Sequence, residues 1–142
     1  MHGGGARALA AAFVLALLAA APAASEVVCS GRRYAANSSF DASLQQVART
    51  LPGNASSSPL LFATLAVAGE AYALALCQGG TSAGSCNYCV AQTMRDGEHA
   101  CAGDADVAMY DDICTVRFSD RDFLAATTNS PEKLVEIGRA HV

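Results

Sequence analysis

Six cysteines are the residues of this sequence best suited to chemistry. They are Cys29, Cys77, Cys86, Cys89, Cys101 and Cys114. Three of them lie close together, with eight residues between Cys77 and Cys86 and two between Cys86 and Cys89. Such spacing is compatible with structural disulfides, a redox-active Cys-x-x-Cys pair or a zinc site.

The surroundings of the cysteines favour structural disulfides. A redox pair normally begins a helix, and Cys86 and Cys89 do begin a predicted helix, so that alternative stays open. A closed zinc site usually needs a second closely spaced ligand pair, but Cys101 and Cys114 are thirteen apart and His99 is the only histidine near them. We therefore expect three disulfides, no free thiol, no metal and no cofactor.

The first residues predict a secretory signal peptide over residues 1–24. Arg7 precedes an uninterrupted apolar run from Ala8 to Ala21, and small residues follow it. The run is short for a membrane span and lacks stop-transfer charges, so we expect cleavage between Ala23 and Glu26. The mature protein is then expected in an oxidising extracellular space, with no membrane span.

The remaining chain predicts one domain over residues 25–129 and a short tail over residues 130–142. Without Arg7, eight basic side chains stand against thirteen acidic ones, and no basic stripe is present. Nucleic acid is therefore not an expected partner.

Two helices and two hairpins are expected in this domain. Apolar residues recur at helical spacing from Phe40 to Leu51, with Ser39 as N-cap and Pro52-Gly53 as the stop. A serine-rich loop should follow over residues 54–59. The apolar segments 60–67 and 71–77 fit either a hairpin or one alanine-rich helix, and the glycine between them favours the hairpin. Residues 85–97 predict a second helix, and the segments 107–110 and 113–118 predict a closing hairpin.

The cysteine motif resembles that of a known plant family. The run from Cys77 to Val90 is similar to the C-x8-C-x2-C signature of the cysteine-rich repeat secretory proteins, also called the stress-antifungal or ginkbilobin-homologous domain. The segment Tyr110 to Ser119 resembles the closing motif of that family. The resemblance implies an α+β fold with two helices packed on an antiparallel sheet of about five strands. It also implies the disulfides Cys29–Cys101, Cys77–Cys86 and Cys89–Cys114.

The resemblance implies a secreted binding protein with a defence or stress role rather than an enzyme. Mannose-binding members of the family carry Asn, Arg and Glu where this chain has Ser30, Ala108 and Ser119. We therefore transfer no carbohydrate-binding residue to this chain, and interpret Arg117 as a structural residue of the last strand. The expected partner is a cell-wall glycan or an extracellular protein. The alternative is a protein-interaction module or a truncated relative of a cysteine-rich receptor-like kinase.

No catalytic residue is predicted. The predicted mature chain has only His99 and His141 as histidines and lacks a Gly-x-Ser-x-Gly elbow. The aspartates between residues 104 and 112 lack the order of a calcium loop and are expected to form a solvated turn. Asn37 and Asn54 begin glycosylation sequons in segments expected at the surface.

Overall fold

The computed structural model describes residues 25–125, which form two helices and five strands. The predicted signal peptide and the predicted tail from residue 130 lie outside the described residues. In chain order the elements are β1 (Glu26–Cys29), α2 (Ser39–Ser57), β2 (Phe62–Val67), β3 (Ala71–Cys77), α3 (Ala83–Ala100), β4 (Asp106–Tyr110) and β5 (Cys114–Ser119).

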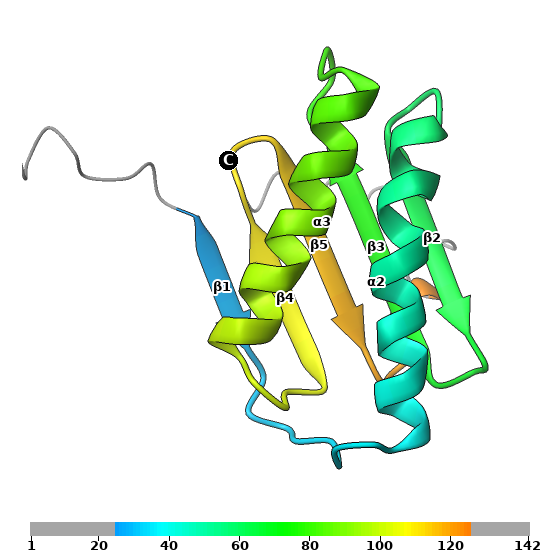
Figure 1. The fold of residues 1–142 in the computed structure, drawn as a ribbon, viewed down its shortest axis with the longest axis vertical. Coiled ribbons are helices and arrows are strands. Elements are labelled where there is room, and N and C mark those ends of the chain that lie inside the picture. Colours follow the sequence, from blue (N-terminus) through cyan, green and yellow to red (C-terminus); the bar gives the residue numbers. More distant parts are fainter. Residues whose placement is uncertain (1–24, 126–142) are drawn as a thin grey trace, which may run out of the picture.

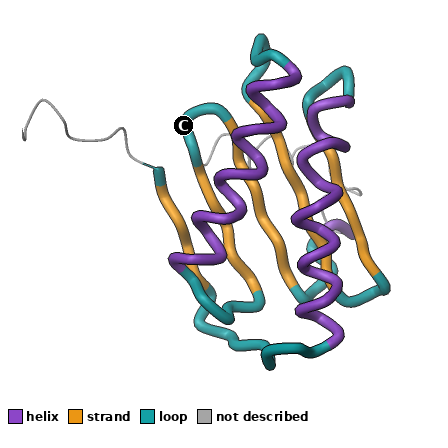
Figure 2. Tube along the Cα trace, viewed as in Figure 1, coloured by secondary structure: helices purple, strands orange, loops and turns teal. Residues whose placement is uncertain are grey.

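The strands form one antiparallel sheet in the order β1-β4-β5-β3-β2. Figure 1 shows both helices on the same face of this sheet, running antiparallel to each other, with α2 over β2 and β3 and α3 over β4 and β5. Figure 2 shows the resulting two layers as purple helices in front of orange strands. The α+β class with two helices on a five-stranded antiparallel sheet is thus confirmed.

The hydrophobic core lies between the helices and the sheet. Helix α2 buries an apolar stripe that includes Leu44, Val47 and Leu51, and α3 contributes Val90 and Met94. The sheet presents alternate residues of its central strands to this stripe, because successive strand side chains point to opposite faces. The core side chains from the sheet are Ala71, Ala73, Ala75, Val107, Met109, Val116 and Phe118.

Helix α2 differs from its predicted bounds at both ends. Its N-cap is Ser38, whose hydroxyl accepts a hydrogen bond from the amide of Asp41, and not Ser39. The helix also continues through Pro52 and ends at Ser57, so the predicted loop from residue 54 is largely helical. Pro52 and Ala55 are both buried, and this packing of the last turns holds the helix beyond the missing amide of proline.

Three disulfides connect the two layers, as expected. They pair Cys29 with Cys101, Cys77 with Cys86, and Cys89 with Cys114, which are the pairs that the family resemblance implies. The first joins β1 to the end of α3, the second joins β3 to the first turns of α3, and the third joins α3 to β5. All three bridges therefore anchor α3, which is the element that sequence reasoning placed at the centre of the cysteine motif.

Gly97 allows α3 to approach β4 closely. A Cβ atom at this position would lie 2.6 Å from Cγ of Met109 and closer still to its Sδ. Met109 is fully buried, so its side chain has little room to move aside. We expect Gly97→Ala to lower the free energy of unfolding by about 1–3 kcal/mol, although alanine is the better helix former. Urea unfolding would measure this loss.

The control for this prediction is the double variant Gly97→Ala/Met109→Ala. It pairs the new methyl group with a smaller side chain. Its loss in free energy of unfolding should therefore be smaller than the sum of the losses of the two single variants. A Gly97→Ala protein as stable as the unmodified protein would contradict the close approach.

Candidate binding cleft

The face of the sheet opposite the helices carries the polar side chains of β4 and β5. On β4, Val107 and Met109 point into the core, so the alternate residues Asp106, Ala108 and Tyr110 lie on this open face. The β4–β5 register pairs Ala108 with Arg117, which places Arg117 on the same face. In Figure 1 the described part of the C-terminal segment, in orange, lies behind the sheet on this side.

A cleft of about 250 Å³ lies on the open face across β1, β4 and β5. We call it the Asp106 cleft. Its lining includes Val28, Ser30, Asp106, Ala108, Tyr110 and Arg117.

The charged groups of the Asp106 cleft are paired with one another. Arg117 donates from Nε and Nη2 to the two carboxylate oxygens of Asp106, at 3.2 and 3.1 Å, and its guanidinium lies 4.3 Å from the ring centre of Phe123. Arg32 bridges Asp106, at 3.3 Å, and Asp120, at 2.6 Å. The hydrogen bond to Asp120 is the main cause of a raised pKa for Arg32. The network supports the structural interpretation of Arg117.

A buried carboxylate fixes the loop that begins this network. Asp104 is only 4% exposed, and it accepts hydrogen bonds from the hydroxyl of Ser30 and from the amides of Gly31 and Asp106 at 2.6 to 2.9 Å. Burial by itself would raise the pKa of Asp104, but these hydrogen bonds outweigh it and hold the pKa below the usual value. Asp104 therefore positions Ser30 and the residues after it.

The predicted solvated turn of aspartates is only partly right. Asp112 is exposed in the β4–β5 turn, whereas Asp104 and Asp106 lie at the other end of β4 and take part in the networks above. Strand β4 separates the two pairs of aspartates, and the hydrogen bonds of Asp104 replace the water that it loses on burial. Alternation of side chains along the predicted hairpin could have placed Asp106 beside Arg117. No local pattern indicates that Arg32 and Asp104 also belong to these networks.

Of the three positions that contact mannose in members of the family, two lie together in this structure and the third does not line the cleft. Ser30 and Ala108 line the Asp106 cleft together. Ser119 is fully buried, and its hydroxyl accepts a hydrogen bond from the amide of Arg121. The hydroxyl of Ser30 is already donated to Asp104, and Ala108 offers no polar side-chain atom. The absence of a transferable mannose site remains our prediction.

The other predicted residues lie away from the cleft. His99 is exposed near the end of α3, while His141 lies outside the described residues. Asn37 is exposed in the loop before α2, and Asn54 is exposed near the end of that helix. Both sequons are thus at the surface of the described part of the chain, and their glycosylation remains a prediction.

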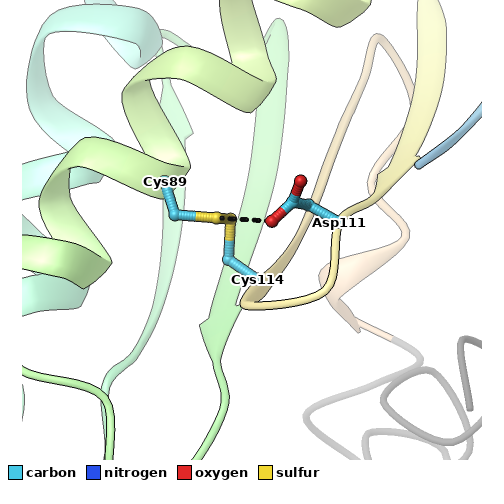
Figure 3. A group of neighbouring side chains, drawn as sticks. All are labelled: Cys89, Asp111 and Cys114. Atoms are coloured by element: carbon cyan, nitrogen blue, oxygen red, sulfur yellow. Dashed lines mark hydrogen bonds between the residues drawn. A yellow bond between two sulfur atoms is a disulfide. The ribbon is translucent and has the colours of Figure 1, made fainter. Parts of the chain in front are cut away.

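Cys86 and Cys89 do not form a redox pair with each other, because each is bonded to a different cysteine. Figure 3 shows the Cys89–Cys114 disulfide beside the carboxylate of Asp111, with Oδ2 of Asp111 3.3 Å from Sγ of Cys89. A disulfide sulfur carries no proton, so this contact is electrostatic. Metal ions bind cysteine as thiolate, and bonded sulfurs provide none, so these three residues are not arranged as a metal site.

Asp111 should protect the Cys89–Cys114 disulfide from reduction. The species that attacks a disulfide is a thiolate anion, and a carboxylate beside the sulfur repels it. Two like charges about 4 Å apart in water repel by about 1 kcal/mol, so Asp111→Asn should speed reduction by glutathione about fivefold at low salt. Mass spectrometry of alkylated time points would measure the rate.

The matched control is Asp112→Asn, which removes the same charge one residue further along the turn. It should change the rate much less, and added salt should shrink the effect of Asp111→Asn. Equal rates for Asp111→Asn and the unmodified protein would contradict this role.

The sequence matches the family model described as salt stress response/antifungal over residues 28–121. The chain belongs to this family. The match covers every helix and strand from α2 to β5, the end of β1, all six cysteines and the whole lining of the Asp106 cleft.

Two similar curated proteins come from Oryza sativa subsp. japonica. Cysteine-rich receptor-like protein kinase 6 is 39% identical over 133 residues, which is 84% of this chain and 19% of that protein. Cysteine-rich receptor-like protein kinase 10 is 36% identical over 110 residues, which is 75% of this chain and 17% of that protein. The chain thus spans about a fifth of the length of these relatives.

Two solved structures share the fold. They are the tandem DUF26 ectodomains of the Arabidopsis thaliana cysteine-rich receptor-like proteins PDLP5 and PDLP8. The TM-scores are 0.63 and 0.64 at 16% and 18% identity, and the match covers 69% of this chain and 50% and 48% of those chains. Within residues 25–125, no helix is long and apolar enough to cross a membrane.

Proposed function

We propose that this protein is a secreted, non-catalytic recognition module of the plant apoplast with a defence or stress role. The observation that carries the proposal is the family scaffold itself, in which three disulfides hold a polar cleft on the open face of the sheet. Disulfides persist in oxidising compartments, which supports an extracellular location. The predicted signal peptide over residues 1–24 supports the same location.

The Asp106 cleft supports binding rather than catalysis. Its lining contains no histidine and no free thiol, and its acidic and basic groups are held in mutual ion pairs. A nucleophile and an adjacent base are the minimum for covalent catalysis, and the cleft lining does not supply them. Paired charges with side-chain exposures of 16% to 33% instead give a fixed polar surface for ligand hydroxyl groups.

We expect the ligand of this cleft to be a glycan other than mannose. Ala108 offers no hydrogen bond, and Ser119 is buried, so two of the three mannose-binding positions contribute no exposed polar group. The charged side chains at or beside the cleft, those of Arg117, Asp106 and Arg32, each keep part of their surface exposed.

A glycan array and a mannose titration on the disulfide-mapped protein test this function. Binding of a non-mannose glycan that Arg117→Gln weakens would support the proposal. Saturable mannose binding by the unmodified protein would contradict the assignment of the ligand. The variant Ala108→Arg, with Ala42→Arg on the exposed face of α2 as its charge control, shows whether the lost arginine decides the response to mannose.

The second candidate function is recognition of an extracellular protein. The identity of 39% to a cysteine-rich receptor-like protein kinase favours this candidate. If the unmodified chain binds no glycan on the array but binds a purified extracellular protein saturably, protein recognition is favoured over glycan recognition.

A further inference from the structure

A second hollow lies at the other end of β4, between the first half of α3 and the β4–β5 turn. Its volume is about 330 Å³, which is at the small end of the range for ligand pockets. We call it the Tyr88 hollow. The side chains used below are those of Tyr88, Gln92, Asp96, Asp111 and Ile113.

The rim of the Tyr88 hollow exposes apolar surface. Tyr88 is 68% exposed and Ile113 is 40% exposed, and they are two of the four large hydrophobic side chains that stand out from the described surface. One comes from α3 and the other from the β4–β5 turn. Exposed aromatic and aliphatic side chains beside a hollow are typical of interaction sites.

The floor of the Tyr88 hollow is held rigidly. The Cys89–Cys114 disulfide joins the helix that carries Tyr88 to the strand that follows Ile113 (Figure 3). Asp111 in turn accepts a hydrogen bond from the amide of Ile113 at 3.1 Å. The two sides of the hollow are therefore fixed relative to each other, which lowers the entropy lost when a ligand binds.

The charge of the Tyr88 hollow is negative. Its lining includes the carboxylates of Asp96 and Asp111 but no lysine, arginine or histidine. Asp96 accepts a hydrogen bond from the amide of Gln92, and the nearby Arg95 donates to the same amide group rather than to Asp96. The ion pairs found among residues 25–125 instead join Asp106 and Arg117 of the other cleft to each other and to the adjacent Arg32 and Asp120.

The positive end of α3 lies beside the same hollow, since Gly84 and Ser85 also line it. A helix N-terminus carries about half a positive charge, and its first amides here are capped by Ser82. Two full carboxylate charges outweigh it, so the hollow favours a cation.

We propose that the Tyr88 hollow binds an arginine side chain presented by a partner protein next to an apolar residue. A guanidinium is planar, so it stacks on the exposed ring of Tyr88 while its N–H groups reach the carboxylates of Asp96 and Asp111. The apolar neighbour contacts Ile113. This inference concerns a surface other than the Asp106 cleft and does not depend on the ligand of that cleft.

The test is an NMR titration of the disulfide-bonded protein with the blocked peptide acetyl-Leu-Arg-Leu-amide. We expect saturable shifts of the amide signals of Tyr88, Asp111 and Ile113. The same peptide with citrulline in place of arginine keeps the shape and loses the charge, so it should bind at least about threefold more weakly at low salt. Shifts of equal size with citrulline, or none at these residues with arginine, would overturn the proposal.

Variants separate the contributions of the ring and of the charge. Tyr88→Ala should weaken binding of the arginine peptide about two- to fivefold, because the exposed cation–π contact is lost. Asp96→Asn should weaken it about two- to fivefold at low salt and leave the surroundings of the disulfide unchanged. The controls are Leu60→Ala, which removes another exposed apolar side chain, and Asp122→Asn, which removes another exposed carboxylate.

These variants lie on the surface, so their folding is checked by the dispersion of the same spectra. A neutral oligosaccharide that shifts the signals of Tyr88 and Asp111 more than the peptide does would assign the hollow to a carbohydrate and also overturn the proposal. If the protein binds the arginine peptide at the Tyr88 hollow but no glycan at the Asp106 cleft, the result contradicts only the proposed function and supports this inference.

Discussion

Replacing Cys29 and Cys101 together by alanine should lower the free energy of unfolding by about 4 kcal/mol. The bridge spans a sequence separation of 72 residues, so it removes more freedom from the unfolded chain than either other bridge. It also fixes β1, an edge strand that pairs with β4 alone. Natural domains are stable by only about 5–15 kcal/mol, so this variant should unfold at a much lower denaturant concentration.

The other two bridges serve as matched controls. The separation is 25 residues for Cys89–Cys114 and 9 for Cys77–Cys86, for which the same relation gives about 3.5 and 2.5 kcal/mol. Guanidinium unfolding of the three double-alanine variants, each with its remaining disulfides mapped, would measure the order. An order that does not follow loop length would show that folded-state contacts near the bridges dominate over chain entropy.

The second large effect is expected at Asp104. Asp104→Ala leaves the hydroxyl of Ser30 and the amides of Gly31 and Asp106 without their acceptor in a largely buried setting. Hydrogen bonds to a charged acceptor contribute more than neutral ones, so we expect a loss of about 2–4 kcal/mol. Asp104→Asn keeps one acceptor oxygen and should lose less. Thermal and urea unfolding at neutral pH would measure both variants.

The same residue predicts a pH dependence. The pKa of Asp104 is lower in the folded than in the unfolded protein, so its stabilisation is fully present above the ordinary aspartate pKa of about 3.9. As the pH falls below that value the unfolded chain takes up the proton first, and stability is lost until the pH has passed the lower folded pKa. Asp104→Asn should therefore flatten the fall in stability below about pH 4, whereas Asp112→Asn, at an exposed carboxylate, should leave it unchanged.

Much of the fold follows from local sequence patterns. Apolar residues at helical spacing predict α2. For the β2–β3 hairpin, the glycine between two apolar runs and the family resemblance favour strands over one alanine-rich helix. These signals are local, because the periodicity of an element depends only on its own face. The bounds of α2 could not be read in the same way, since the burial of Pro52 and Ala55 against other elements holds its last turns.

The Asp106 cleft and the Tyr88 hollow could be predicted only in part. Sequence reasoning identified Ser30, Ala108 and Arg117 as residues of interest, and the structure places all three at one cleft. It interpreted Asp104 as part of a solvated turn, because a carboxylate close in sequence to other carboxylates is normally exposed. The hydroxyl and amides that satisfy Asp104 come partly from residues more than 70 positions away, and no local pattern indicates such partners.

The sequence by itself determined that the chain has six cysteines, an even number that can all pair in disulfides. It also determined the apolar periodicity of the helices and the motif that marks the family. Each of these properties is carried by residues close together in the chain. The tertiary structure alone decided which strands are neighbours, that Arg32, Asp106, Arg117 and Asp120 meet, and that Tyr88 and Ile113 lie on either side of one hollow. These contacts depend on the packing of α3 against the sheet and on the order of the strands, which bring distant residues together.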